Sequence, residues 1–251
     1  MIKKREKVKS AIFLQVRLKS ERLNEKAFLK LKRKSILQHI VERFLSIKKN
    51  INYIAILTPV EDREKISKHL SKYLNNIIVF GGDEDNVLKR FYDANKKIDA
   101  DVIIRATADN PLVSIYHLVK ALNFHIRLNN DYTIFRDLPL GLGVEVLSSF
   151  ALNEAFKSSK EIYQKEHVTP YIREHKERFK ISYLEVEKFY RHPDWRLTVD
   201  EEKDFELMKI IYDNLYKGKP ISVKEVILFL KKNPELILIN KSVKQKIVVP
   251  I

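Results

Sequence analysis

The sequence contains no cysteine and only five glycines among its 251 residues. The absence of cysteine excludes disulfide bonds, thiolate zinc sites and thiol catalysis. Apolar residues nevertheless make up 45% of the chain, close to the usual share of about 45–50% in folded domains. The chain is therefore expected to bury a core of its own without covalent cross-links.

Long apolar runs are also missing. None approaches the roughly 18 residues that a membrane-spanning helix requires. The first ten residues are basic, but the apolar stretch that follows is too short for a secretory signal and soon reaches Arg17. We therefore expect a cytoplasmic protein without a membrane partner.

Acidic residues are in deficit: 33 Asp and Glu stand against 48 Lys and Arg, giving a net charge of +15. Such a charge fits an anionic partner such as a nucleic acid or a phosphorylated substrate. It also fits a general compositional bias, because lysines are spread along the chain rather than clustered. No helix-turn-helix, RNP or zinc pattern supports nucleic-acid binding. We favour the bias and keep a basic nucleic-acid-binding protein as the non-enzymatic alternative.

In the first half of the chain, short apolar segments alternate with helical patterns. This alternation predicts an α/β fold with a mostly parallel sheet and helices on both faces. The expected strands are 11–16, 51–57, 76–80 and 101–106, and the expected helices are 35–45, 61–74, one capped by Asp83, and 114–128.

The second half is less regular. The expected strands are 144–147, 180–186 and 195–199, and the expected helices are 149–157, one around 167–175, 201–216 and 223–231. Gly218 is expected to cap the end of the helix 201–216. Because no linker rich in proline, glycine or serine separates the halves, we predict one domain, 1–251.

Ligands of open α/β sheets bind at the carboxyl ends of the strands, so the loop after the first strand is informative. Four of its cations lie within ten residues and could hold a polyphosphate. The candidate binding residues of this segment are Gln15, Arg17, Lys19, Ser20, Arg22 and Lys26. The loop lacks the glycines of a Walker or dinucleotide motif. A solvated basic loop is the alternative.

Two further loops carry candidate ligands. The turn 81–86 holds two glycines and Asp83, and suits either close approach to a nucleoside or an ordinary helix cap. In the segment 105–111, Asp109 is placed to ligate Mg²⁺. Asp200 is a second candidate ligand, although an Asp before a helix is also a common cap. The seven histidines show no HExxH spacing.

Together these loops resemble the nucleotide-sugar cytidylyltransferases, which activate Kdo and sialic-type sugars, and within them the spore coat polysaccharide protein F branch. The family's Q-A-R-x-x-S-x-R-L-P-G-K signature corresponds to residues 15–26, with Asn24-Glu25 replacing Pro-Gly. Further motifs match in the same order at 82–91, 105–112, 166–172, 195–200 and 233–236. Gly143 replaces the carboxylate of the family's G-L-D-V-E, while Glu145 is kept.

The resemblance implies a Rossmann-like nucleotidyltransferase fold with a nucleotide-binding half, 1–130, and an acceptor-binding and dimerisation half, 131–251. It implies transfer of CMP from CTP to an acidic sugar, with pyrophosphate released. Implied nucleotide-binding residues are Gln15, Arg17, Ser20, Arg22, Lys26, Gly82, Asp83 and Arg105; of these, Arg17 and Lys26, with Asp109, are implied to be catalytic.

By the same resemblance, Asp109 and Asp200 would hold Mg²⁺. Glu145, His167 and Arg173 would face the acceptor, with His167 as a proton acceptor. The family commonly forms homodimers, and 189–195 could belong to an arm over the partner.

Three alternatives remain open at this point. A glycosyltransferase would use a D-x-D motif, for which Asp83-Glu84-Asp85 is the nearest match. A degenerate homologue would bind nucleotide without turnover, as Asn24-Glu25 and Gly143 could suggest. The nucleic-acid binder is the third.

Overall fold

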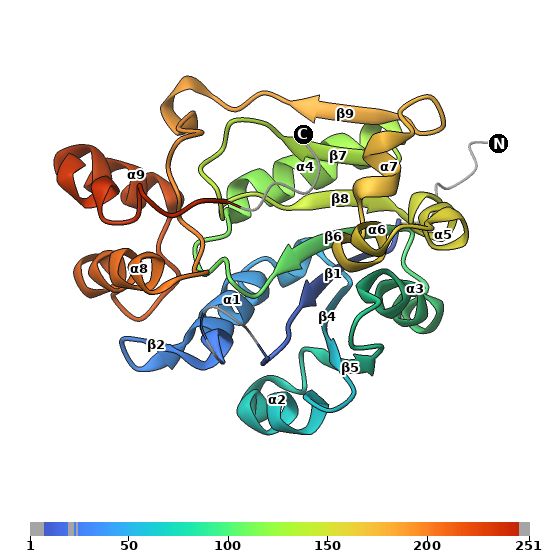
Figure 1. Ribbon diagram of the computed structural model, residues 1–251, viewed down its shortest axis with the longest axis horizontal. Helices are drawn as coiled ribbons and strands as arrows, with labels where there is room; N and C mark the ends of the chain where they lie inside the picture. The colour runs from blue at the N-terminus through green and yellow to red at the C-terminus, as the bar shows by residue number, and fades with distance from the viewer. Residues whose placement is uncertain (1–7, 20–22, 24, 246–251) are drawn as a thin grey trace.

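A seven-stranded sheet with helices on both faces organises the chain (Figure 1). The computed structural model describes residues 8–19, 23 and 25–245. The strand order is β5-β4-β1-β6-β8-β7-β9. The strands are β1 (Ser10–Gln15), β4 (Tyr53–Pro59), β5 (Ile78–Gly82), β6 (Val102–Thr107), β7 (Tyr132–Phe135), β8 (Glu145–Ser148) and β9 (Ile181–Leu184).

Strand β8 alone among these seven runs against the others. It pairs antiparallel with both β6 and β7, whereas the β5-β4-β1-β6 and β7-β9 pairings are parallel. The expected α/β fold with a mostly parallel sheet is confirmed. Because β8 pairs with β6, one sheet joins the two halves of the chain. A separate hairpin of β2 (Lys30–Leu31) and β3 (Lys34–Ser35) follows β1.

The helices cover the two faces of the sheet. They are α1 (Ile36–Leu45), α2 (Arg63–His69), α3 (Val87–Ile98), α4 (Ile115–Leu128), α5 (Ser149–Ser158), α6 (Ile162–His167), α7 (Pro170–Glu174), α8 (Glu202–Leu215) and α9 (Val223–Lys232). Short 3-10 helices are η1 (Lys26–Phe28), η2 (Lys48–Asn50), η3 (Ser71–Tyr73), η4 (Lys188–Tyr190) and η5 (Pro234–Leu238). Within the described residues, no helix is long and apolar enough to cross a bilayer.

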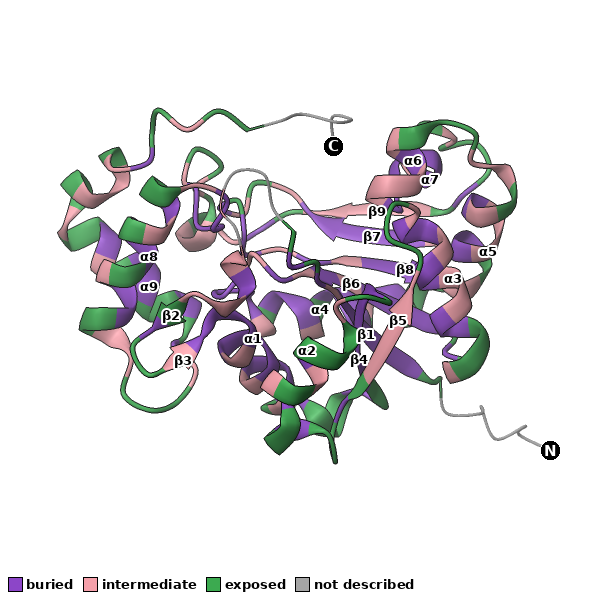
Figure 2. Cartoon of the chain, turned by 60° about the horizontal axis from the view of Figure 1, so that its bottom comes forward, coloured by how far each residue is buried: buried purple, intermediate pink, exposed green. Residues whose placement is uncertain are grey.

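Alternation along the strands divides the core between the faces. In β1, Ile12 and Leu14 belong to the core cluster that includes residues of α1, α4, α8 and α9, whereas Ala11 and Phe13 belong to the cluster that includes residues of α3, α5 and α7. This is the two-residue period of a strand buried on both sides. Figure 2 shows the buried residues along the sheet and on the sides of the helices that face it. Ser35 caps α1 and Ser114 caps α4, and both helices begin where the sequence analysis expected them.

The loop after β5 differs from the expectation. Gly81–Gly82 belongs to β5 instead of ending it. Helix α3 is capped by Asn86, whose side chain accepts from the amide of Lys89. Asp83 is therefore not the cap: its carboxylate accepts from the amides of Asp85 and Asn86 and closes the turn before the helix.

Other expected elements also differ from the structure, most of them in the second half of the chain. Segment 195–199 forms no strand and makes one isolated bridge, between Leu140 and Arg196. Strand β7 was not expected, because its four residues are too short to give a clear alternation. Helix α8 has Tyr216 at its C-cap, and Gly218 lies two residues beyond it. The helices expected at 61–74 and 167–175 are each interrupted.

Candidate active site

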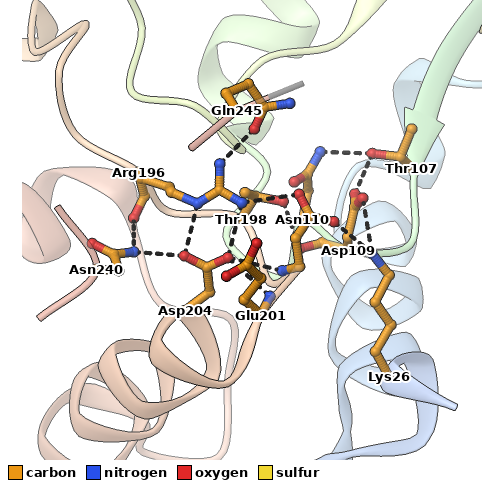
Figure 3. Close-up of polar contacts among 11 residues, drawn as sticks. Lys26, Thr107, Asp109, Asn110, Arg196, Thr198, Glu201, Asp204, Asn240 and Gln245 are labelled. Atoms are coloured by element: carbon orange, nitrogen blue, oxygen red, sulfur yellow. Dashed lines mark hydrogen bonds and ion pairs between the residues drawn. The ribbon is translucent and has the colours of Figure 1, made fainter. Parts of the chain in front are cut away.

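Lys26, Asp109 and Asp200 meet near the carboxyl ends of β1 and β6. Lys26 Nζ lies 2.7 Å from Asp200 Oδ1 and 3.4 Å from Asp109 Oδ2. Lys26 begins η1, Asp109 follows β6, and Asp200 lies just before α8. Residues separated by more than 170 positions thus bring one ammonium and two carboxylates together. Figure 3 shows the ammonium of Lys26 directed at Asp109.

Main-chain contacts explain how Asp109 and Asp200 come together. The amide of Val199 donates to the carbonyl of Asp109 over 2.8 Å. The Thr107 hydroxyl donates to Asp109 Oδ1, and the side-chain amide of Asn110 donates to Thr107 Oγ1 over 2.7 Å. These contacts hold segment 195–199 against the loop after β6 and fix the Asp109 carboxylate.

A buried ion-pair network of Arg196 and Asp204 holds Asp200 in place. Arg196 donates to Asp204 through Nε and Nη2, over 2.8 and 2.9 Å, and to Asp200 Oδ2 over 3.1 Å. Asp204 also accepts from the amides of Asp200 and Glu201. Burial opposes the charge of Arg196, but the two carboxylates outweigh it and raise its pKa. Glu201, not Asp200, is the N-cap of α8, so the capping alternative for Asp200 is wrong.

The sequence analysis missed Arg196 and Asp204. Arg196, Asp200 and Asp204 recur at intervals of four residues, and this spacing was the available signal. Arg196 precedes α8, however, so helical periodicity alone does not predict the contact. Asn240, from beyond α9, completes the network by donating to Asp204 Oδ1 over 2.8 Å.

Glu25 keeps the local path that a glycine would favour. Its φ is 47°, in the left-handed region, at the position where the family signature has glycine. The Glu25 carboxylate forms an ion pair with Lys65. The replacement of Pro-Gly therefore leaves a left-handed residue directly before Lys26. Of the other predicted residues, Gln15 ends β1 and Arg17 is exposed beyond it, while Ser20 and Arg22 lie outside the described residues.

A second charged cluster surrounds Glu145 in β8. Arg105 donates to Glu145 Oε2 and, over 3.1 Å, to Gln15 Oε1. Glu145 Oε1 accepts from the hydroxyls of Tyr132 and Thr169. Both oxygens of Glu145 thus have protein donors, and its carboxylate holds Arg105 in place. Tyr132 and Thr169 were not anticipated, because their contacts join elements far apart in the sequence.

The electrostatics of this cluster keep Glu145 charged and His167 neutral. Burial opposes the charge on Glu145, but Arg105 and Arg173 outweigh it and lower its pKa. Burial is also the main cause that lowers the pKa of His167; Arg105 and Arg173 reinforce it against the opposing charges of Glu166 and Glu145. The His167 side chain remains about one-third exposed, at 34%. A neutral, accessible imidazole can accept a proton.

A strained turn separates His167 from Thr169. Val168 has φ 70° and ψ −51°, and the amide of Thr169 donates to the carbonyl of His167 over 2.8 Å. This geometry is that of a classic γ-turn, which is rare for a β-branched residue. The turn ends α6 and lets Thr169 reach Glu145, which brings the predicted acceptor residues to one cluster.

The loop after β5 faces the loop after β1. Lys19 Nζ lies 2.9 Å from Glu84 Oε1. Asp83 Oδ1 is occupied by two main-chain amides, and Glu84 by Lys19. These contacts do not favour a D-x-D metal site at 83–85.

The donor set at Lys26 fits a cation. Among the described residues there is no group of three or more acidic or histidine side chains suited to a metal. Asp109 and Asp200 nevertheless offer one carboxylate each to the ammonium of Lys26. Mg²⁺ commonly takes only one or two carboxylates and completes its shell with phosphate and water, so the pair suits it.

The segment considered as a dimerisation arm contacts its own chain. Tyr190 stacks on Tyr116 of α4, and His192 stacks on Trp195. Lys231 of α9 lies 4.7 Å from the centroid of the Phe189 ring. The homodimer stays a prediction.

Comparison with known proteins identifies the family. The chain is 39% identical over 236 residues to an uncharacterized protein of Methanocaldococcus jannaschii, covering 93% of this chain and 95% of that one. It is 32% identical over 228 residues to the spore coat polysaccharide biosynthesis protein SpsF of Bacillus subtilis, covering 88% and 94%. A solved cytidylyltransferase from Leptospira borgpetersenii superposes with a TM-score of 0.84 at 27% identity, covering 97% and 100%. The cytidylyltransferase family model matches residues 11–233, so the chain belongs to the cytidylyltransferase family and is a CTP-dependent nucleotidyltransferase.

Proposed function

We propose that the protein transfers CMP from CTP to a hydroxyl of an acidic sugar, sialic-type, Kdo-like or related, for surface polysaccharide biosynthesis. The observation that carries this proposal is the meeting of Lys26 with Asp109 and Asp200 beside the Arg105–Glu145 cluster. The first group suits a metal-bound triphosphate. The second offers cationic side chains to an acidic acceptor.

In this proposal the triphosphate lies along the loop after β1. Arg17 and Lys26 bind phosphate oxygens, as would Ser20 and Arg22. Lys26 offsets the charge that develops on the leaving pyrophosphate. Gln15 and Arg105, which are joined by a hydrogen bond, border the nucleotide site. Gly82 and Asp83 line its nucleoside end.

Asp109 and Asp200 would hold Mg²⁺, which when bound neutralises phosphate charge and makes the α-phosphorus more electrophilic. The Thr107 hydroxyl and Arg196 hold these two carboxylates in place before any ligand arrives. Such support is what a site of fixed geometry requires.

The acceptor would lie against Arg105, Arg173 and His167. The two guanidinium groups favour a carboxylate, and Glu145 orients Arg105 rather than binding the sugar directly. His167 accepts the proton of the attacking hydroxyl. A new oxygen–phosphorus bond forms as the bond to pyrophosphate breaks, so catalysis is mostly positioning and charge stabilisation. A Cβ at Gly143 would meet only Leu138, at 3.9 Å, so the space beside this position is open.

Pyrophosphate release with CTP, Mg²⁺ and a panel of acidic and neutral sugars tests the acceptor class. We expect release with one acidic sugar and none with its neutral counterpart. Release with neutral sugars alone would contradict the acidic acceptor. A glycosyltransferase would instead release nucleotide from a finished nucleotide sugar, and a degenerate homologue would bind CTP without turnover. The homodimer and the cytoplasmic location stay predictions.

A further inference from the structure

Arg90 is a buried cation on the nucleotide side of the fold that the proposed mechanism does not use. It lies in the first turns of α3 and is only 2% exposed. Among the described residues, no carboxylate lies within ion-pair distance of its guanidinium. Burial is the main cause that lowers the pKa of Arg90. Asp83 raises this pKa and Arg17 lowers it. A buried charge without a counterion is costly unless its donors are used.

The donors of Arg90 are used on main-chain carbonyls. Nε and Nη2 donate to the carbonyl of Asp83 over 2.9 and 2.7 Å, and Nη2 donates to that of Glu84 over 2.9 Å. A weaker contact of 3.5 Å reaches the carbonyl of Leu57 in β4. The guanidinium thus ties the loop after β5 to the neighbouring strand.

The glycine before this loop makes room for Arg90. A Cβ at Gly82 would lie 2.8 Å from Arg90 Cγ and 3.3 Å from the ring of Phe80. Any larger residue at 82 would push the stem of Arg90 away from the carbonyls it binds. The close approach of the Arg90 side chain therefore explains why residue 82 is a glycine.

Arg90 also fixes the direction of the amides in this loop. In a trans peptide the carbonyl and the following N–H point in opposite directions, and the chain has no cis peptide among its described residues. With the Asp83 carbonyl turned toward Arg90, the N–H of Glu84 points away from it. Within the described residues that N–H donates to no protein group, whereas the next one, of Asp85, is taken by the Asp83 carboxylate.

We infer that Arg90 is a positioning residue that presents the loop 83–85 to the base of the nucleotide and sets the preference for CTP over UTP. Ring N3 of cytosine accepts a hydrogen bond, whereas N3 of uracil donates one. A main-chain N–H held in a fixed direction therefore favours cytosine and leaves uracil with two opposed donors. This inference rests on the nucleoside placement proposed above, but not on the identity of the acceptor.

The test compares CTP and UTP binding in two buried-arginine variants, Arg90→Lys and Arg43→Lys. Arg43 is the matched control: it is 3% exposed and donates to the carbonyls of Val113 and Ile221 over 2.9 and 2.7 Å. Both variants should lower the melting temperature. Only Arg90→Lys should reduce the ratio of the UTP to the CTP dissociation constant, by about tenfold, the value of one hydrogen bond.

The outcomes separate this inference from the function proposed above. A folded Arg90→Lys protein with an unchanged ratio overturns the role of Arg90 while leaving CTP binding intact. Equal affinity of the wild-type protein for CTP and UTP overturns the selectivity itself. If the wild-type protein binds neither nucleotide, both the proposed nucleotide site and the role of Arg90 are overturned. Should Arg90→Lys not fold, Gly82→Ala displaces the same side chain and is expected to reduce the same ratio.

Discussion

The ammonium of Lys26 lies 2.7 Å from Asp200 Oδ1, at the point between Asp200 and Asp109 where a divalent cation would bind both carboxylates. A lysine ammonium and Mg²⁺ repel one another at such separations. Binding of the metal would therefore displace Lys26. The triphosphate gives the displaced ammonium a new anionic partner, so metal and nucleotide are expected to bind together better than either does alone.

Lys26→Met should accordingly change metal and nucleotide binding in opposite directions. Without nucleotide, Mn²⁺ should bind the variant several-fold more tightly, because no ammonium competes for the carboxylates. CTP should bind more weakly, because a phosphate ligand is lost. Electron paramagnetic resonance of free Mn²⁺ and calorimetry with CTP measure the two effects. Lys34→Met, which removes a lysine paired with Glu42 over 2.7 Å, is the control. Weaker Mn²⁺ binding to Lys26→Met would contradict the competition.

Glu25 occupies a left-handed conformation that an ordinary side chain adopts at a cost of about 1 kcal/mol. Glu25→Gly should relieve that strain and lose only an exposed ion pair with Lys65, which contributes little. The free energy of unfolding should therefore change by no more than about 1 kcal/mol. Glu25→Val, which keeps the strain and adds a β-branched side chain, should be clearly less stable in urea. Equal stability of the valine and glycine variants would show that the backbone here is unstrained.

Asp204 compensates the charge of Arg196 in a site closed to solvent, with its side chain 0% exposed. Asp204→Ala should lower the free energy of unfolding by about 3–5 kcal/mol, because Arg196 keeps its charge and loses a buried partner. Asp213→Ala at the surface, where the carboxylate pairs with Lys32, should change it by less than about 0.5 kcal/mol. Urea denaturation of both variants measures the difference. Similar losses would mean that the buried network does not stabilise the fold.

Acid should weaken the fold through His125. Burial lowers the pKa of His125 from 6.5 to about 4, so between these values the unfolded chain binds a proton that the folded chain does not. The contribution of His125 is fully present above pH 6.5 and is lost as the pH falls to about 4, by up to about 3 kcal/mol. His125→Asn should reduce the slope of unfolding free energy against pH in this window by close to one proton. An unchanged slope would mean that His125 already titrates normally in the folded state.

Much of the fold follows from local patterns in the sequence. Short apolar runs such as 11–16 and 101–106 predicted the parallel strands, and the helices expected at 35–45 and 114–128 form as α1 and α4, capped by Ser35 and Ser114. Strand β7 was not predicted, because its four residues are all buried and show no alternation of buried and exposed positions. Segment 195–199 was expected to be a strand, but the amide of Val199 donates to the loop after β6 rather than to a neighbouring strand.

The candidate site was only partly predictable. Asp109 and Asp200 were predicted because each follows a segment that was expected to be a strand, and the family motif adds Lys26. Their supports, Arg196 and Asp204, depend on contacts that the fold topology creates, so their four-residue spacing with Asp200 does not by itself indicate them. Asp83 was misassigned because both Asp83 and Asn86 are good capping residues, and the side chain of Asn86 is the one that reaches the first amides of α3.

The central claim, that Asp109 belongs to the centre where CTP reacts, is tested most directly by pyrophosphate release from CTP in Asp109→Asn. The substitution removes a charge but little volume, so the melting temperature should change little. With Mg²⁺ and the acceptor that the wild-type protein uses, turnover should fall by at least about a hundredfold, the loss typical of one preorganised charge contact. Asp213→Asn, at the surface, should retain turnover. Metal-dependent release by Asp109→Asn near the wild-type rate would contradict the account.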